Sequence, residues 1–293
     1  MILRLPWLQG VPWLESVPIF LARGHRVNKV IGFIGAGNIN SALIGGLMAS
    51  GVSADSIIVS NPSADKLTQL SEQYGIKTTT NNTDVAEQSD VIILGVKPYN
   101  IAPVCQEIAP VCQDALIVSV AAGIPIADIA AHFPVQQAIV RVMPNTPSLV
   151  GKGASGICSN EYVSDEQANT VQAIFATTGT TELIAQESLM DLVTALSGSG
   201  PAYFFYIAEA MLKEATSQGM SEAQAQRLIY QTMAGAAELL QQSDLAPEAL
   251  RNKVTSPGGT TAAALEVLQQ QDVSTAMQQA LKAAVIRGQE LAK

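Results

Sequence analysis

The stretch VIGFIGAGNINSALIGGL, residues 30–47, decides the fold of this chain. A short β-branched run ends at Ile34, glycines follow at Gly35 and Gly37, and an apolar helical pattern begins at once. Glycines at these two places permit a tight turn and let the backbone approach a pyrophosphate at a helix N-terminus. Asn40 replaces the third glycine of this fingerprint, and a glycine-rich turn that binds nothing is the alternative. A preceding strand, a following helix and a second strand favour dinucleotide binding.

Further strands follow along the first half of the chain. Each is a short, nearly continuous apolar run, and helical patterns over 40–49, 64–74 and after Pro125 separate the runs. Strands covered on both faces have this composition, so the pattern predicts an α/β fold with a Rossmann-like, doubly wound parallel sheet. The predicted strands are VIGFI (30–34), SIIVS (56–60), DVIILGV (90–96), ALIVSV (115–120) and AIVRV (138–142), with 153–159 and 181–185 as candidate edge strands.

The end of the second strand indicates which dinucleotide binds. A site that prefers NAD usually carries an acidic residue there, which holds the ribose 2′-hydroxyl. Here Ser60, Asn61 and Ser63 are neutral, and Lys66 lies close in sequence. Nothing at these positions repels a 2′-phosphate, so NADPH is the expected cofactor and NADH the second choice.

Three loops at the ends of later strands complete the expected cofactor site. They cover residues 95–100, 120–125 and 143–147, at the carboxyl ends of strands, where open α/β sheets bind ligands. The alternative is that their prolines are turn formers and that Lys97 is an ordinary solvated residue.

After about Glu187 the strand patterns stop and helical patterns follow. Residues 203–216 are apolar nearly all round at first, which predicts a buried helix. Ser221 and Gln224 have the spacing of a capping box, and Ser164 and Gln167 show it earlier in the chain. A helical domain this thin is expected to bury its apolar faces by forming a homodimer.

Residues 1–28 fit neither pattern. They hold both tryptophans and three prolines, and Glu15 interrupts the apolar core that a signal peptide needs. We expect a disordered appendage or a start codon placed too far upstream, and the alternative is a peptide that touches a membrane or a partner. The chain is thus divided into an appendage (1–28), a dinucleotide-binding domain (29–186) and an all-helical substrate and dimerisation domain (187–293).

Composition argues against several classes of partner. The 293 residues carry a formal net charge of −9, and their lysines and arginines are scattered. An acidic chain without a basic stripe does not favour nucleic acid or an anionic membrane. No apolar run approaches the ~20 residues of a spanning helix. Three cysteines without a CxxC pair and two distant histidines predict reduced thiols, no metal site and a cytoplasmic location.

Six stretches together resemble the pyrroline-5-carboxylate reductase family. In chain order they are GFIGAGNI, GVKP, VSVAAGI, RVMPNTP, ALSGSGPAYFF and VTSPGGTT, and the resemblance extends from about Val30 to Arg287. Enzymes of that family reduce 1-pyrroline-5-carboxylate to L-proline with NADPH or NADH, the last step of proline biosynthesis. They join a Rossmann-like domain to a helical dimerisation domain, and their dimers often assemble into decamers. The resemblance implies the same reaction and a homodimer here, and it leaves the decamer open.

The resemblance also implies the cofactor-binding residues. They are Ile34, Gly35, Ala36, Gly37, Asn38 and Ile39 for the pyrophosphate, Asn61 and Ser63 for the adenosine end, Asn82 for the ribose, and Gly95, Val96, Lys97, Pro98 and Ala122 for the nicotinamide half. Two residues depart from the family pattern. Asn40 stands where a small residue is common, and Lys253 stands where some members have a polar side chain near the cofactor.

The implied substrate residues lie in two places. They are Glu187, Ser256, Gly258, Gly259, Thr260 and Thr261. Thr261 and Glu187 are the implied catalytic residues: Thr261 hydrogen-bonds the ring nitrogen, and Glu187 or a water helps to manage its proton.

The stretch VTSPGGTT, residues 254–261, offers hydroxyls and backbone N–H groups but no acid or base. A cyclic imine is partly protonated near neutral pH, and an iminium accepts hydride without further activation, so position and charge complementarity suffice. The turn at Gly258 and Gly259 is able to direct N–H groups at the substrate carboxylate. The alternative is an ordinary capped helix start, with Ser256 or Thr255 as N-cap and Pro257 at the first position.

Two other functions are weaker. β-Hydroxyacid dehydrogenases share the domain plan and resemble one another in a GSGxxxK signature, but here no lysine follows residues 198–200 until Lys213. A dinucleotide-binding module without activity would have no use for the donor-rich stretch at 254–261.

Overall fold

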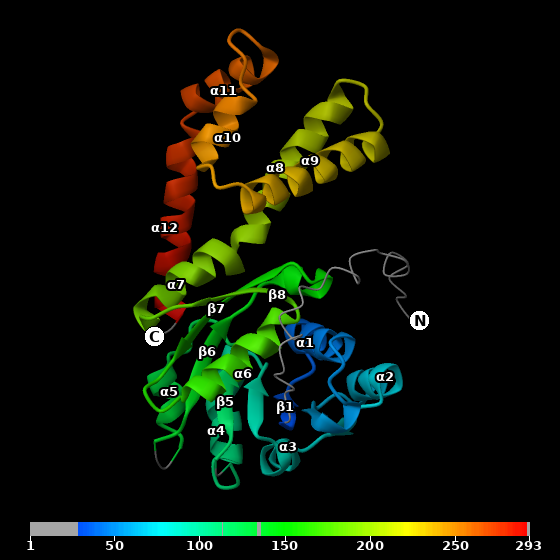
Figure 1. The fold of residues 1–293 in the computed structure, drawn as a ribbon, viewed down its shortest axis with the longest axis vertical. Coiled ribbons are helices and arrows are strands. Elements are labelled where there is room, and N and C mark those ends of the chain that lie inside the picture. The colour runs from blue at the N-terminus through cyan, green and yellow to red at the C-terminus, as the bar shows by residue number, and fades with distance from the viewer. Residues whose placement is uncertain (1–28, 113, 134–135, 292–293) are drawn as a thin grey trace. The chain divides into compact units, whose positions relative to one another are not determined.

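The structure, a computed structural model, describes residues 29–112, 114–133 and 136–291 (Figure 1). The predictions for residues 1–28 lie outside this range. The described residues form two compact units: the first contains the described residues up to Val193 together with Leu291, and the second is Thr194–Glu290. Within the described part of the chain, no helix is both long and apolar enough to cross a membrane.

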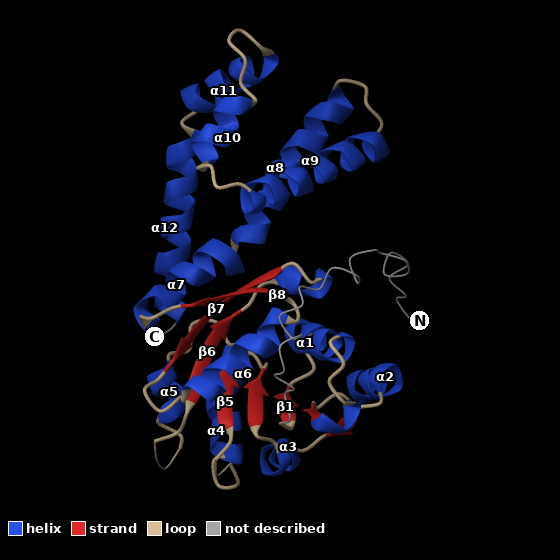
Figure 2. Cartoon of the chain, in the orientation of Figure 1, coloured by secondary structure: helices blue, strands red, loops and turns tan. Residues whose placement is uncertain are grey.

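The first unit is built around an eight-stranded sheet, drawn in red in Figure 2. Its strand order is β3-β2-β1-β4-β5-β6-β7-β8, and neighbours run parallel except for β6 and β7, which are antiparallel. The strands are β1 Ile31–Ile34, β2 Ile57–Ser60, β3 Lys77–Thr79, β4 Val91–Leu94, β5 Leu116–Ser119, β6 Ile139–Met143, β7 Gly153–Ser159 and β8 Gly179–Leu183. The order reverses direction at β1, so the carboxyl ends of β1 and β4 form the crevice where such sheets bind ligands.

Helices cover both faces of this sheet. They are α1 Asn38–Ala49, α2 Ala64–Tyr74, α3 Asn82–Gln88, α4 Ile101–Ile108, α5 Ile126–Ala130, α6 Asp165–Ala176 and the short α7 Met190–Val193. One apolar cluster joins α1, α2 and α6 to strand residues such as Phe33, and another joins α3, α4 and α5 to residues such as Ile34. Successive strand residues therefore serve opposite faces, and both faces are buried.

The sequence predictions for this unit are largely confirmed. All five long strands form, both candidate edge strands form, and α6 begins with the capping box in which Ser164 and Gln167 satisfy each other's backbone N–H groups. The strand β3 was missed because Lys77–Thr79 is polar and has little buried surface at the edge of the sheet. Cys105, Cys112 and Cys158 are free and buried, and burial raises the pKa of Cys105 to about 12.

The second unit is all helical. A π-helical turn, Thr194–Gly198, precedes α8 Gly200–Ser217, α9 Glu222–Gln242, α10 Pro247–Lys253, α11 Thr260–Gln270 and α12 Val273–Leu291. The capping box at Ser221 and Gln224 is present at the start of α9. The prediction of a buried helix over 203–216 is wrong for the single chain, because α8 packs mainly on α9 and leaves Phe204 and Phe205 60% and 66% exposed.

Candidate active site

The glycine-rich loop between β1 and α1 has the geometry that a dinucleotide requires. Gly35 has a φ of +98°, and a Cβ there would lie 2.8 Å from the Gly95 carbonyl oxygen, so only glycine fits. The Gly35 N–H donates to the Ser60 carbonyl at 2.8 Å, which fixes the loop to β2. Gly37 is the N-cap of α1, and no side chain caps the helix. The first N–H groups of α1 therefore remain available for a phosphate.

Two asparagines lie beside this loop, and their side chains are fixed by hydrogen bonds. Asn61 Oδ1 accepts from the Ala36 N–H at 3.1 Å, and its Nδ2 donates to the Ser63 carbonyl at 3.3 Å. Asn82 Oδ1 accepts from the Ser60 hydroxyl at 2.7 Å, and its Nδ2 donates to Glu107 at 2.8 Å. Both side chains are thus oriented within the protein and shape the region next to the loop.

The remaining candidate cofactor residues follow β2, β4 and β5. The Gly95 N–H donates to the Ile34 carbonyl at 2.9 Å, so the end of β4 lies directly against the loop. Lys97, Pro98, Ser63 and Ala122 are exposed, and Val96 is half-buried. The structure therefore brings residues 34–39, Asn61, Asn82 and Gly95 together and leaves the others in loops at the same edge of the sheet.

Glu187 is held by a network that the sequence did not reveal. Its Oε1 accepts from the Ile126 N–H at 2.7 Å and from Arg141 Nη1 at 3.2 Å. Arg141 also donates to Asp191 at 3.3 Å, and its side chain is 7% exposed. Arg141 lies in β6, within the RVMPNTP stretch, and a single arginine inside an apolar strand was the signal that could have identified it.

The donor-rich stretch ends in an uncapped helix. Helix α11 begins at Thr260, its N-cap is Gly259, and no side chain caps it. Gly258 adopts a φ of +71°, and the Gly259 N–H donates to the Ser256 carbonyl at 3.0 Å. The alternative reading of a helix capped by Ser256 or Thr255 is wrong, since the helix starts later and the Thr255 hydroxyl donates to the Arg251 carbonyl at 2.7 Å.

This late start leaves the first backbone N–H groups of α11, at Thr260 and Thr261, without a side-chain acceptor on the N-cap. A carboxylate is the kind of group that such a helix start attracts. Glu187 and the stretch 256–261 belong to different units.

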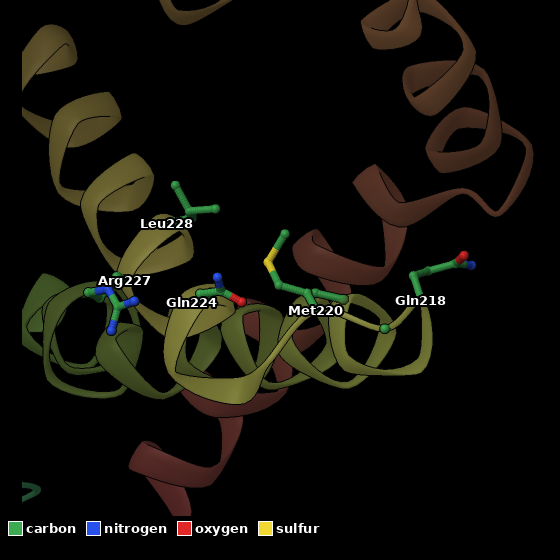
Figure 3. Close-up of a pocket in the computed structure, with 7 residues that line it drawn as sticks. Gln218, Met220, Gln224, Arg227 and Leu228 are labelled. Atoms are coloured by element: carbon green, nitrogen blue, oxygen red, sulfur yellow. The ribbon is translucent and has the colours of Figure 1, made fainter.

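Two hollows of the surface differ in their relation to these residues. The larger, about 600 Å³, is lined by the α8–α9 turn and contains none of the predicted site residues (Figure 3). A second, about 380 Å³, is lined by residues that include Ile126, Cys158 and Glu187. Among the described residues, no group of three or more His, Cys, Asp or Glu side chains is placed to hold a metal ion.

Known proteins resemble this chain over most of its length. Residues 187–291 match the family model for pyrroline-5-carboxylate reductase dimerisation, and residues 30–123 match the model described as NADP oxidoreductase, coenzyme F420-dependent. A pyrroline-5-carboxylate reductase of Pseudomonas aeruginosa is 42% identical over 264 residues, which cover 90% of this chain and 97% of that protein. This chain belongs to the pyrroline-5-carboxylate reductase family.

Solved structures of the family have the same fold. A pyrroline-5-carboxylate reductase of Coxiella burnetii is 38% identical and superposes with a TM-score of 0.87, over 90% of this chain and 99% of that one. The enzyme of Plasmodium falciparum, solved with NADP bound, is 30% identical and has a TM-score of 0.82, over 91% of this chain and 99% of that one. The Rossmann-like sheet and the helical dimerisation domain predicted from sequence are thus confirmed, and the chain is a homo-oligomer-forming oxidoreductase of this family.

Proposed function

We propose that this protein reduces 1-pyrroline-5-carboxylate to L-proline with NADPH, the last step of proline biosynthesis. One observation carries the proposal. This member of the family has both a glycine-rich loop in which position 35 accepts only glycine and a helix start, α11, that is rich in hydrogen-bond donors. Residues 29–186 bind the cofactor, and residues 187–293 bind the substrate and dimerise. NADH serves as the weaker alternative.

The loop and its neighbours fit a dinucleotide. The uncapped N-terminus of α1 binds the pyrophosphate, with Ile34–Ile39 around it, and the neutral Asn61 and Ser63 accept a 2′-phosphate. Asn82 lies at the ribose, and Gly95–Pro98 with Ala122 line the nicotinamide half. When bound, NADPH supplies the hydride.

The helix start at 256–261 binds the substrate. The N–H groups of Gly259, Thr260 and Thr261 and the positive end of α11 neutralise the carboxylate, and Ser256 contributes a hydroxyl. Thr261 hydrogen-bonds the ring nitrogen. This contact positions the imine carbon and strengthens as the nitrogen becomes an amine.

The proton balance requires no strong acid in the protein. The protonated imine already carries the proton that the product amine keeps, and the hydride completes the reduction at carbon. Glu187 lies near the substrate, where its carboxylate favours the iminium through charge. The N–H of Ile126 and the guanidinium of Arg141 hold that carboxylate in place.

The proposal extends to the assembly and the location of the protein. The apolar side chains that the second unit leaves exposed support a dimer, and the resemblance to the family extends the proposal to a decamer of five dimers. A cytoplasmic location fits the free thiols.

A steady-state assay tests this function. The purified protein is mixed with pyrroline-5-carboxylate and either NADPH or NADH, and cofactor oxidation and proline formation are followed together. We expect one proline for each NADPH oxidised and a higher kcat/KM with NADPH. Cofactor oxidation that is independent of pyrroline-5-carboxylate, or no turnover with either cofactor, would contradict the proposal.

A further inference from the structure

Asn40 occupies a position that its size does not suit. It stands where the dinucleotide fingerprint has its third glycine, whose role is close helix–strand packing. Its side chain is only 1% exposed, so the carboxamide is packed inside the fold rather than turned to solvent. A larger residue at a close-packed position requires space from a neighbour.

Gly95, at the end of β4, provides that space. A Cβ built on Gly95 would lie 2.5 Å from Asn40 Oδ1 and still closer to Cγ and Nδ2, which real atoms do not tolerate. The carboxamide of Asn40 therefore lies flat against the Gly95 backbone. The fold accommodates the large side chain at position 40 because position 95 has no side chain.

The same carboxamide holds the dinucleotide-binding loop. Asn40 Nδ2 donates to the Gly35 carbonyl at 2.7 Å, and the Ile34 carbonyl lies at 3.5 Å. Gly95 also contacts the loop, since its N–H donates to the Ile34 carbonyl and its own carbonyl lies next to Gly35. The turn at Gly35 is thus held both by the first turn of α1 and by the end of β4.

One atom of this arrangement is costly. Asn40 Oδ1 is buried and has no hydrogen-bond partner among the described residues. If the amide were rotated by half a turn, this oxygen would face the Gly35 carbonyl oxygen and repel it. The observed orientation is therefore fixed by the hydrogen bond from Nδ2 to the Gly35 carbonyl. A buried acceptor left unpaired destabilises a fold and is retained where the geometry it accompanies is used.

We propose that Asn40 and Gly95 form a coupled pair that positions the dinucleotide-binding loop for the pyrophosphate. Asn40 is a positioning residue that acts through the Gly35 carbonyl, and Gly95 is its steric complement. The inference rests on the proposed role of the loop in cofactor binding. It predicts that either residue alone is intolerant of change, whereas a joint change to two alanines restores the packing.

A double-mutant cycle on NADPH affinity tests the pair. The dissociation constant is measured by fluorescence titration for the wild type, Asn40→Ala, Gly95→Ala and the double variant. Loss of one hydrogen bond to the loop predicts a roughly three- to tenfold weaker affinity in Asn40→Ala. Gly95→Ala, which forces the carboxamide out of place, is expected to lose at least about thirtyfold. The double variant is expected to return to within about threefold of Asn40→Ala, because the added Cβ then fills the vacated space.

Further readouts separate positioning from general destabilisation. NADH affinity should fall by the same factors as NADPH affinity, since both cofactors share the pyrophosphate, and the KM for pyrroline-5-carboxylate should stay within about twofold in Asn40→Ala. If the two single losses multiply in the double variant, the pair is not coupled and the inference is wrong. If Gly95→Ala fails to fold, wild-type NADPH affinity in Asn40→Ala still refutes it. Failure of the wild type itself to bind NADPH would instead refute the proposed function.

Discussion

The two units of this chain bury their apolar side chains to very different extents. In the first, two clusters on either side of the sheet contain large residues such as Phe33 and Phe175 that are fully buried. In the second, the buried cluster consists of Ala208, Ala225 and Ile229, with a few partly buried neighbours. The first unit has its own core, whereas the second has helices that still need one.

This difference indicates how the second unit is completed. Phe204, Phe205 and Tyr206 on α8 are 60%, 66% and 74% exposed in the single chain. Large apolar side chains exposed close together on one helix are typical of a surface that binds another protein. Residues 187–291 match a dimerisation model. We therefore expect a second copy of the chain to cover these side chains, and we expect the stability of the second unit to depend on protein concentration.

The largest expected effect is therefore at an exposed residue. Phe205→Asp removes an aromatic side chain and buries a charge in each of two subunits, which we expect to weaken dimerisation by about 4–6 kcal/mol and to abolish turnover at micromolar concentration. Analytical ultracentrifugation measures the mass. Tyr162→Asp, which introduces the same charge at an exposed aromatic residue of the first unit, is the control for the mass. A dimeric, active Phe205→Asp protein would contradict the claim that the second unit buries this face of α8 against a second copy of the chain.

In the first unit a buried ion network should carry the next largest effect. Arg141→Met leaves the carboxylates of Glu187 and Asp191 unpaired, and we expect the free energy of unfolding to fall by about 3 kcal/mol. Urea denaturation measures this loss, which should not depend on protein concentration. Arg251→Met removes an exposed ion pair to Glu248 and should change stability by less than about 0.5 kcal/mol. Equal effects of the two substitutions would contradict the assignment.

The role of the second unit in chemistry depends on Thr261. Thr261→Ala should lower kcat/KM for pyrroline-5-carboxylate roughly ten- to a hundredfold, about 1.5–3 kcal/mol, because the ring nitrogen loses a hydrogen bond. NADPH affinity, measured by fluorescence, should hardly change, since the cofactor is bound by the first unit. Thr261→Ser keeps the hydroxyl and should recover much of the rate. Wild-type turnover in Thr261→Ala would reduce this residue to a helix-start position.

The smallest effect concerns the cofactor preference of the first unit. Asn61→Asp retains an acceptor for the Ala36 N–H but places a negative charge where a 2′-phosphate binds. We expect the ratio of kcat/KM with NADPH to that with NADH to fall about tenfold, or about 1.4 kcal/mol. Asn61→Ala, which loses the acceptor without adding charge, should weaken both cofactors alike. An unchanged ratio in Asn61→Asp would place the 2′-phosphate elsewhere.

The same contrast explains what could be predicted from sequence. The strands of the first unit were recognisable because burial on both faces leaves continuous apolar runs, and their order along the chain implies a doubly wound sheet. The polar edge strand Lys77–Thr79 has no such signal. The apolar composition over 203–216 predicted a buried helix. We attribute this composition to burial in the oligomer, because the single chain leaves the aromatic residues of the helix exposed.

Contacts between distant residues account for what was missed in the site. Arg141 meets Glu187 and Asp191, which lie 46 and 50 residues away, and no local pattern encodes that pairing. The space for Asn40 comes from Gly95, directly after β4, so the unusual residue at position 40 was visible in the sequence but the glycine that accommodates it was not. Helix α11 starts only at Thr260 because of the turn at Gly258. In the sequence, Ser256 fits the pattern of an N-cap, which suggested an earlier start.

The most direct test of the central claim follows the hydride itself. The protein is given pyrroline-5-carboxylate and NADPH that carries deuterium at both C4 positions of the nicotinamide, and the proline is examined by mass spectrometry and NMR. The account predicts one deuterium in each proline molecule, on the ring carbon that was double-bonded to nitrogen. Proline without deuterium, or NADPH oxidation without proline, would contradict it.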